Sequence, residues 1–206
     1  MSFPKKPEVM PLRPEFSSGP CAKRPGWSIK KIETIMLLGR SHRAVEPKKQ
    51  LKEVIELTKK IAKIPHDFKV AIVPASNTGA YEMAMWNILG KNPVDVFAWE
   101  SFGFGWATDA TTQLKLQQCR VMSAEYGFLP ELDLVREDAD ICFAWNGTTS
   151  GVRVPNANWI PKERKGLVLC DATSAIFSQD LDWTKLDVTT FSWQKSLGSE
   201  AAHGML

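Results

Sequence analysis

The order of apolar and polar positions along the chain predicts helices and strands that follow one another in turn. The clearest helix runs from Pro47 to Lys63, where Leu51, Val54 and Ile61 lie on one face at steps of three and four residues. Short apolar runs bounded by turn-forming residues predict strands. The predicted strands are residues 68–73, 94–99, 119–122, 140–145, 166–170 and 187–192.

Shorter helical segments are predicted at residues 27–38 and 81–89, and again up to Leu116. Polar loops follow the carboxyl ends of most predicted strands. This alternation favours an α/β fold with a mostly parallel wound sheet and a site along one sheet edge. Residues 1–15 are rich in proline and lysine, so we expect an extended arm there, followed by one domain over residues 16–206.

Composition narrows the class of protein. The chain has 206 residues, 44% hydrophobic and 24% charged, with a net charge of +3. This charge is too weak to indicate nucleic-acid binding but is compatible with an anionic substrate. No apolar run reaches membrane-spanning length, and the first residues lack a secretory pattern. We therefore expect a soluble cytoplasmic protein without a membrane partner.

The cysteines and histidines do not form a metal-binding pattern. The cysteines are far apart and mostly lie in apolar runs, which predicts buried thiols in a reducing compartment. The histidines are scattered, so no metal site is expected. These residues are Cys21, Cys119, Cys142, Cys170, His42, His66 and His203.

Two predicted strands end in residues that can carry chemistry. Asp171 follows the strand at 166–170, and Lys195 lies just after the strand at 187–192. If the strands are neighbours, a carboxylate and an amine point into one crevice. A lysine can form a Schiff base with pyridoxal phosphate while an acid keeps the pyridine nitrogen protonated. Taken alone, the pair favours a surface lysine and a turn-forming aspartate, because exposed lysines are far commoner than catalytic ones.

Three other segments are candidates for ligand contacts. The loop Ser76–Ala80 lies between a strand and a helix and lacks the nucleotide P-loop motif, so it suits a single phosphate or is an ordinary loop. Gly103 and Gly105 form only part of a dinucleotide fingerprint. We interpret residues 100–108 as a loop that presents Trp106 to a flat ring. Arg43 has the two-pronged geometry that binds carboxylates.

Five motifs in order resemble one family. Together they are similar to the phosphoserine aminotransferases, class V and fold-type I pyridoxal-phosphate enzymes, in the branch of methanogenic archaea and rhizobia. The motifs are Phe-Ser-Ser-Gly-Pro at 16–20, Ser-His-Arg at 41–43, Asn-Gly-Thr-Thr-Ser-Gly at 146–151, Cys-Asp-Ala-Thr-Ser at 170–174 and Ser-Trp-Gln-Lys-Ser-Leu-Gly at 192–198.

The resemblance implies a role for each matching residue. Lys195 would hold the cofactor and Asp171 its ring nitrogen. The other implied cofactor contacts are Trp106 stacked on the ring, Thr148 near the ring hydroxyl, and Gln194, Thr78 and Gly79 at the phosphate. Arg43, with His42 beside it, would hold the substrate carboxylate.

The resemblance also implies a reaction and an assembly. The reaction converts 3-phosphohydroxypyruvate and L-glutamate to O-phospho-L-serine and 2-oxoglutarate, and the enzyme is a homodimer. Other class V aminotransferases, acting on alanine or serine and glyoxylate, remain an alternative, as does an inactive fragment. Family members continue past Leu206 into a smaller C-terminal domain, so we expect an incomplete large domain here.

Overall fold

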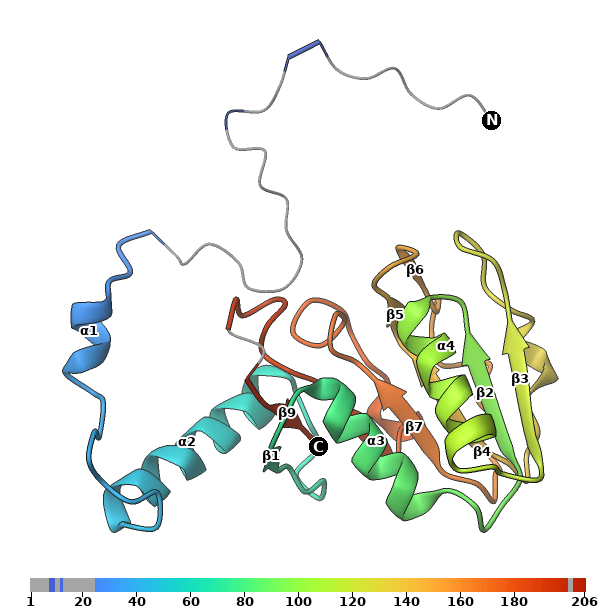
Figure 1. Cartoon of the computed structure of the whole chain (residues 1–206), viewed down its shortest axis with the longest axis horizontal. Helices are drawn as coiled ribbons and strands as arrows, with labels where there is room; N and C mark the ends of the chain where they lie inside the picture. The colour runs from blue at the N-terminus through green and yellow to red at the C-terminus, as the bar shows by residue number, and fades with distance from the viewer. Residues whose placement is uncertain (1–7, 10–11, 13–24, 200–201) are drawn as a thin grey trace.

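A parallel sheet of five strands forms the centre of the computed structural model, which describes residues 8–9, 12, 25–199 and 202–206 (Figure 1). The strand order is β3-β2-β4-β7-β8, and every neighbouring pair is parallel. These strands are β2 (Val94–Ala98), β3 (Cys119–Ser123), β4 (Asp140–Ala144), β7 (Val168–Asp171) and β8 (Val188–Thr190). The predicted wound α/β fold is therefore present.

Beyond β8 the sheet continues through an antiparallel strand. A bridge between Phe191 and Met205 joins the end of β8 to β9 (Gly204–Met205). β9 in turn pairs antiparallel with β1 (Ile72–Val73). The predicted strand at 68–73 is thus ordered as a strand only at its last two residues, where β9 lies alongside it. A short hairpin, β5 (Asn146–Gly147) with β6 (Val152–Arg153), follows β4.

Helices α3 and α4 cover one face of the sheet (Figure 1). They span α3 (Asn77–Ile88) and α4 (Ser101–Thr108), and η1 (Asp109–Gln113) continues α4. Side chains alternate between the faces of a strand, so Val94 and Val96 of β2 pack towards α3 and α4, while Phe97 packs into the core on the opposite side. Both faces of the sheet are therefore apolar, as in other parallel sheets.

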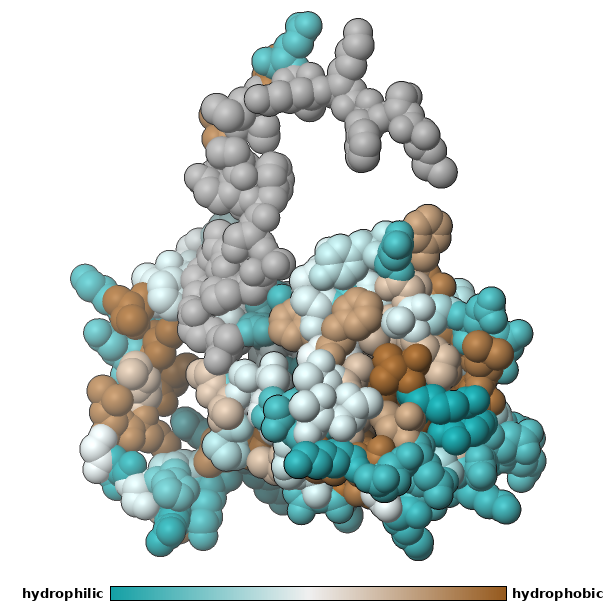
Figure 2. Space-filling model, turned by 45° about the vertical axis from the view of Figure 1, so that its right-hand side comes forward, coloured by the Kyte–Doolittle hydropathy of each residue, from teal (hydrophilic) through white to brown (hydrophobic). Residues whose placement is uncertain are grey.

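Of the two N-terminal helices, one agrees with the prediction and the other is shorter than predicted. α2 (Val45–Ile61) agrees with the predicted amphipathic helix, but α1 (Ile29–Glu33) is much shorter than the predicted segment 27–38. α1 has no buried residue to stabilise a longer helix. Ile29, Ile35 and Leu38 are exposed, and Figure 2 shows apolar side chains at the left of the molecule, where α1 lies in Figure 1. The remaining short helices are η2 (Leu132–Leu134) and η3 (Trp183–Lys185).

Several sequence predictions concern other parts of the chain. The extended arm at 1–15 and the motif at 16–20 lie almost wholly outside the described residues, as does Cys21. Cys142 and Cys170 are buried free thiols, whereas Cys119 is half-buried. Among the described residues, no helix has the length and apolar character needed to cross a membrane.

Candidate functional site

The candidate site lies at the carboxyl ends of β7 and β8. These strands are parallel neighbours, and Asp171, the last residue of β7, is in register with Thr190, the last residue of β8. Lys195 lies in a turn over residues 193–197, directly after that edge, and its side chain is half-buried. The condition that the two strands be neighbours is therefore met, and it brings the segments carrying the carboxylate and the amine to one edge of the sheet.

Asp171 accepts hydrogen bonds from Thr173, the residue two positions further along the chain. Its Oδ1 accepts from the backbone N–H of Thr173 at 2.8 Å and from the Thr173 hydroxyl at 2.7 Å. Burial raises the pKa of Asp171 from 3.8 to about 6, although the hydrogen bonds from Thr173 oppose this shift. The nearby Glu100 carboxylate raises this pKa further, and the Asn77 side chain lowers it. Asp171 is therefore a carboxylate whose charge is incompletely compensated.

The segment that was predicted to bind phosphate forms the first turn of α3. Asn77 is the first helical residue, and no side chain caps the helix N-terminus among the described residues. The first N–H groups of a helix have no partner within the helix, so they can bind an anion. The Asn77 side chain is only 7% exposed, and its Oδ1 has no partner among the described residues. The Asn77 side chain also lowers the pKa of Asp171, which places this helix end close to that carboxylate.

The backbone before α3 is strained, and it approaches the helix closely. Ala75 has a φ of 71°, a left-handed conformation that is unfavourable for residues other than glycine. A Cβ at Gly79 would lie 2.9 Å from the Cβ of Ala75. Gly79 is thus needed for this tight turn, and strain of this kind is common at ligand-binding sites.

A set of hydroxyl and amide groups lies beside Asp171. Ser174 Oγ accepts from Asn146 Nδ2 at 2.8 Å and from Thr148 Oγ1 at 3.0 Å. It donates in turn to the Asn146 carbonyl. Thr148 is therefore held near the end of β7 through its hydrogen bond to Ser174, and its role near a cofactor ring stays a prediction.

Glu100 is a second buried carboxylate near the same edge. It is 1% exposed, and its Oε1 accepts from the Gly103 N–H at 2.6 Å, which caps α4. The Thr149 hydroxyl donates to its other carboxylate oxygen at 3.3 Å. Glu100 thus orients α4 and also adds negative potential at Asp171.

The interpretation of residues 100–108 as a loop is wrong, because Glu100 caps a helix there and Trp106 lies within α4. The Trp106 side chain is 2% exposed and stacks on Tyr81, with ring centroids 4.1 Å apart. In this arrangement Trp106 is part of the core. Its stacking on a cofactor stays a prediction and would require one ring face to be uncovered.

The turn that contains Lys195 is close to several unpaired polar atoms. Gln194 is half-buried in this turn. Ser192 Oγ, Trp193 Nε1 and His203 Nε2 are buried and have no hydrogen-bond partner among the described residues. The Trp193 and His203 rings meet edge to face at 4.6 Å. Buried polar groups normally have partners, so this edge of the sheet has unmet capacity to bind a polar ligand.

Arg43 and His42 lie apart from these residues. Both are exposed in the turn between α1 and α2, where the Arg43 N–H donates to Ser41 Oγ at 3.1 Å. α1 and the start of α2 are at the far left of Figure 1, away from β7. The structure therefore does not bring the predicted substrate-binding residues together with Asp171.

Sequence reasoning assigned no separate role to three residues that contact this site, namely Thr173, Ser174 and Glu100. An aspartate that accepts from the backbone two residues further on forms an Asx-turn, a local signal that could have identified Thr173. The contact of Asn77 with Asp171 joins segments that are far apart in the sequence. No local pattern indicates such a contact.

Comparisons with known proteins agree on one group of enzymes. The chain is 58% identical over 201 residues to a phosphoserine aminotransferase of Methanosarcina barkeri and 57% identical to one of Methanosarcina mazei. Each match covers 98% of this chain and 54% of the relative, so the chain spans about half the length of these curated relatives. No family model matches the chain.

Solved structures of the same group share the fold. A phosphoserine aminotransferase from Cytophaga hutchinsonii is 26% identical with a TM-score of 0.71, covering 86% of this chain and 49% of that protein. An alanine–glyoxylate aminotransferase from Nostoc sp. has a TM-score of 0.74 at 18% identity, covering 95% and 55% respectively. At that identity the second likeness concerns the fold alone.

Proposed function

This chain belongs to the phosphoserine aminotransferase family over the part of the family's length that it spans, and we propose that it acts in pyridoxal-phosphate-dependent amino transfer. The reaction we propose converts 3-phosphohydroxypyruvate and L-glutamate to O-phospho-L-serine and 2-oxoglutarate, a step of serine biosynthesis. The observation that carries the proposal is the pair of parallel strands that end in Asp171 and lead to Lys195.

The residues at this edge fit the cofactor. Asp171 is a mostly buried carboxylate with a raised pKa, which suits a cationic ring nitrogen. The uncapped first turn of α3, with Asn77, Thr78 and Gly79, suits the phosphate. When bound, pyridoxal phosphate would supply an aldehyde carbon that carries the amino group from one substrate to the other and a ring that acts as an electron sink.

The chain's own groups would then have separate tasks. The Lys195 amine would hold the cofactor covalently, and in its free form it would move the proton at the substrate Cα. The Asp171 carboxylate keeps the ring nitrogen protonated. Thr148 would lie near the ring hydroxyl and Gln194 near the phosphate, and Trp106 would lie on the ring face once its own ring is uncovered.

The proposed substrate-binding roles of Arg43 and His42 depend on one structural condition. To hold a substrate carboxylate, the turn between α1 and α2 must lie over the site, from this subunit or from a second one. We propose that the working protein is a homodimer in the cytoplasm, and that Arg43 binds the carboxylate that both substrates share.

The test is covalent labelling of the purified chain. Pyridoxal phosphate is added, the bond to protein is reduced with borohydride, and the labelled peptide is mapped. We expect the label on Lys195, no label there in Lys195→Ala, and unchanged labelling in the matched control Lys162→Ala, which removes an exposed lysine. Labelling spread evenly over several lysines, and unaffected by Lys195→Ala, would contradict the proposal.

The substrates are tested by single half-reactions. The loaded protein is mixed with L-glutamate, O-phospho-L-serine, L-alanine or L-serine, and the loss of the cofactor's absorption band is followed. We expect reaction with L-glutamate and O-phospho-L-serine. Faster reaction with L-alanine would instead support the alanine–glyoxylate alternative.

A further inference from the structure

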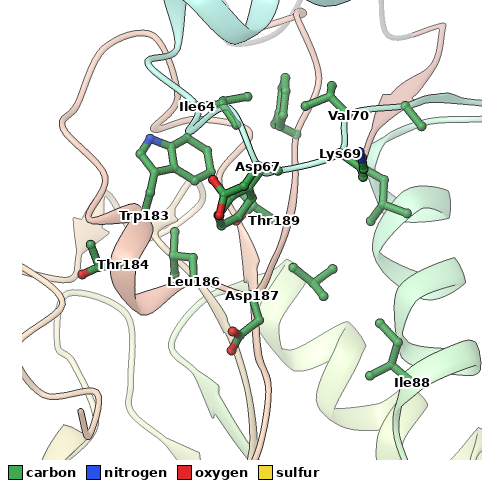
Figure 3. Close-up of a pocket in the computed structure, with 15 residues that line it drawn as sticks. Ile64, Asp67, Lys69, Val70, Ile88, Trp183, Thr184, Leu186, Asp187 and Thr189 are labelled. Carbon is green, nitrogen blue, oxygen red and sulfur yellow. The ribbon is translucent and has the colours of Figure 1, made fainter.

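A cluster of hydrogen-bonded side chains joins the hairpin after β4 to the segment after β7. Its members are Asn146, Thr148, Ser174 and Gln179, and we call it the Ser174 cluster. It is separate from the cavity of about 740 Å³ that opens beside β8 (Figure 3), because none of its four residues lines that cavity. The Ser174 cluster instead lies next to Asp171, at the carboxyl end of β7.

The Ser174 hydroxyl has three neighbours, and their chemistry determines the direction of each hydrogen bond. A hydroxyl carries one hydrogen and two lone pairs. Asn146 Nδ2, at 2.8 Å, can only donate, so it uses one lone pair. The Asn146 carbonyl oxygen, at 3.2 Å, can only accept, so it uses the hydrogen. One lone pair is left for Thr148 Oγ1 at 3.0 Å, so Thr148 donates to Ser174.

A contact with Gln179 fixes the orientation of the Asn146 amide. Asn146 Oδ1 accepts from Gln179 Nε2 at 3.5 Å, which directs the amide nitrogen towards Ser174. The backbone of Asn146 is in β5 and pairs with Arg153 of β6. Both groups of Asn146 that hold the Ser174 hydroxyl are therefore themselves held in place.

The same accounting gives the Thr148 hydroxyl a defined polarity. Its one hydrogen is used by Ser174, so Thr148 Oγ1 has only lone pairs to offer to another partner. The next residue, Thr149, is tied to α4, because its hydroxyl accepts the Ser101 N–H at 3.0 Å and donates to Glu100 at 3.3 Å. The loop is thus anchored on two sides, and a group that binds to Thr148 Oγ1 has to be a donor.

We propose that Ser174 is a positioning residue that holds the Thr148 hydroxyl as a hydrogen-bond acceptor towards the candidate site. The proposal rests on the proposed function, in which Thr148 lies near the ring hydroxyl of pyridoxal phosphate. An acceptor at that place favours the protonated ring hydroxyl over its anion, because the anion has no hydrogen to donate. Without the Ser174 hydroxyl, Thr148 is free to donate its hydrogen to the anion.

The first measurement uses the cofactor-free chain. The χ1 rotamer of Thr148 is determined by NMR from the three-bond couplings of its methyl group. We expect one rotamer in the unchanged chain, averaging between rotamers in Ser174→Ala, and one rotamer again in Ser174→Thr, which keeps the hydroxyl. Ser178→Ala is the matched control, because it removes an exposed hydroxyl of the same segment that donates to the Ala175 carbonyl. A Thr148 rotamer that Ser174→Ala leaves unchanged would overturn the proposal.

The second measurement follows the ring hydroxyl directly. The probe is pyridoxine 5′-phosphate, which lacks the aldehyde and therefore does not react with Lys195. Its absorption spectrum is recorded across the pH range with the protein in excess. In Ser174→Ala we expect the midpoint of the ring-hydroxyl titration to fall by on the order of half a pH unit or more. Ser174→Thr should restore the midpoint, and Ser178→Ala should not move it.

The titration distinguishes positioning from a general loss of structure. A purely structural change would weaken binding of the probe without moving the midpoint. The other charged groups near this edge are the same in all variants, namely Asp171, Glu100 and Lys195. A midpoint that is unchanged or raised in Ser174→Ala, with the probe bound, would therefore overturn the proposal.

The two measurements also separate this proposal from the proposed function. Failure of pyridoxine 5′-phosphate to bind the unchanged chain would count against pyridoxal-phosphate-dependent amino transfer. The NMR measurement contains no cofactor, so it would still decide whether Ser174 holds the Thr148 hydroxyl.

Discussion

Asp95 and Asp171 are two carboxylates in the same parallel sheet, but they lie at opposite ends of it and in opposite electrostatic surroundings. Asp95, near the start of β2, is 0% exposed and forms ion pairs with Arg120 at 2.8 Å and Arg136 at 2.7 Å. It also accepts the Arg136 backbone N–H at 2.9 Å. Burial alone would raise the pKa of Asp95, but hydrogen bonds from the two arginines keep it below its ordinary value.

Asp171, at the end of β7, accepts hydrogen bonds from uncharged groups, and its pKa is raised to about 6. The two sites illustrate two uses of a buried charge. At Asp95 the protein supplies the cations, and the carboxylate joins β2, β3 and the segment at Arg136. At Asp171 the compensation is incomplete, so a cationic ligand would gain from binding there.

The largest expected effect is at Asp95. Asp95→Asn leaves two guanidinium groups without their counter-charge, so we expect the free energy of unfolding at pH 7 to fall by about 3 kcal/mol. Urea denaturation followed by circular dichroism measures this, with the exposed Asp133→Asn as control. Because the pKa of Asp95 is lowered in the folded state, its contribution is present above the unfolded pKa and is lost as the pH falls. A loss that is equally large at pH 3 would contradict the assignment.

The next expected effect, at Asp171, is a gain in the free energy of unfolding instead of a loss. Folding raises the pKa of Asp171 from 3.8 to about 6, so its favourable contribution is present below 3.8 and is lost as the pH rises through 6. Asp171→Asn should therefore stabilise the cofactor-free chain at pH 8 by on the order of 1–3 kcal/mol, with little gain at pH 4. The same change should weaken pyridoxal phosphate binding by about tenfold or more, because a charge-assisted hydrogen bond is lost.

Urea denaturation at the two pH values and a binding titration at pH 8 test both halves of this prediction. A variant that is less stable at pH 8 would show that Asp171 is compensated in the way that Asp95 is. The comparison between the two carboxylates would then fail.

The sequence predicts those features of the fold and the site that depend on neighbouring residues, and it misses those that depend on contacts between distant segments. The central strands, and the placement of Asp171 and Lys195 after strands, follow from apolar runs that end in polar motifs, whereas the sequence left open whether those two strands are neighbours. The helix at 101–108 was missed because Gly103 and Gly105 suggest a loop, whereas the Glu100 cap stabilises a helix. Gly103 fits because a Cβ there would lie only 3.2 Å from the Ala98 Cα.

Other features depend on contacts between distant segments. Residues 68–71 have the composition of a strand, but only Ile72 and Val73 pair with β9 as strand β1, and Ala71 exchanges two hydrogen bonds with Leu206. The contact of Asn77 with Asp171 and the position of the turn at Arg43 are set by tertiary packing. Local sequence patterns contain no information about such packing.

A smaller effect is expected when one hydrogen bond to Asp171 is removed. Thr173→Val deletes the hydroxyl donor and keeps the backbone N–H, so the pKa of Asp171 should rise further. The free energy of unfolding at pH 8 should fall by about 1 kcal/mol, the typical value of one such bond. Carboxyl chemical shifts measured by NMR across the pH range report the pKa. Thr184→Val, which affects a similar bond at Asp182, is the control and should leave Asp171 unchanged.

The smallest expected effect tests the comparison most directly. It removes a charge near Asp171 without removing any hydrogen bond from Thr173 to Asp171. Glu100 raises the pKa of Asp171 through repulsion. Glu100→Gln removes that charge, while the amide oxygen can still accept from Gly103 and cap α4. The pKa of Asp171 should therefore fall, and cofactor binding near pH 6 should strengthen, because more of Asp171 is ionised there. If α4 stays folded and the Asp171 titration does not move, Glu100 acts only as a helix cap, and the raised pKa of Asp171 comes from burial alone.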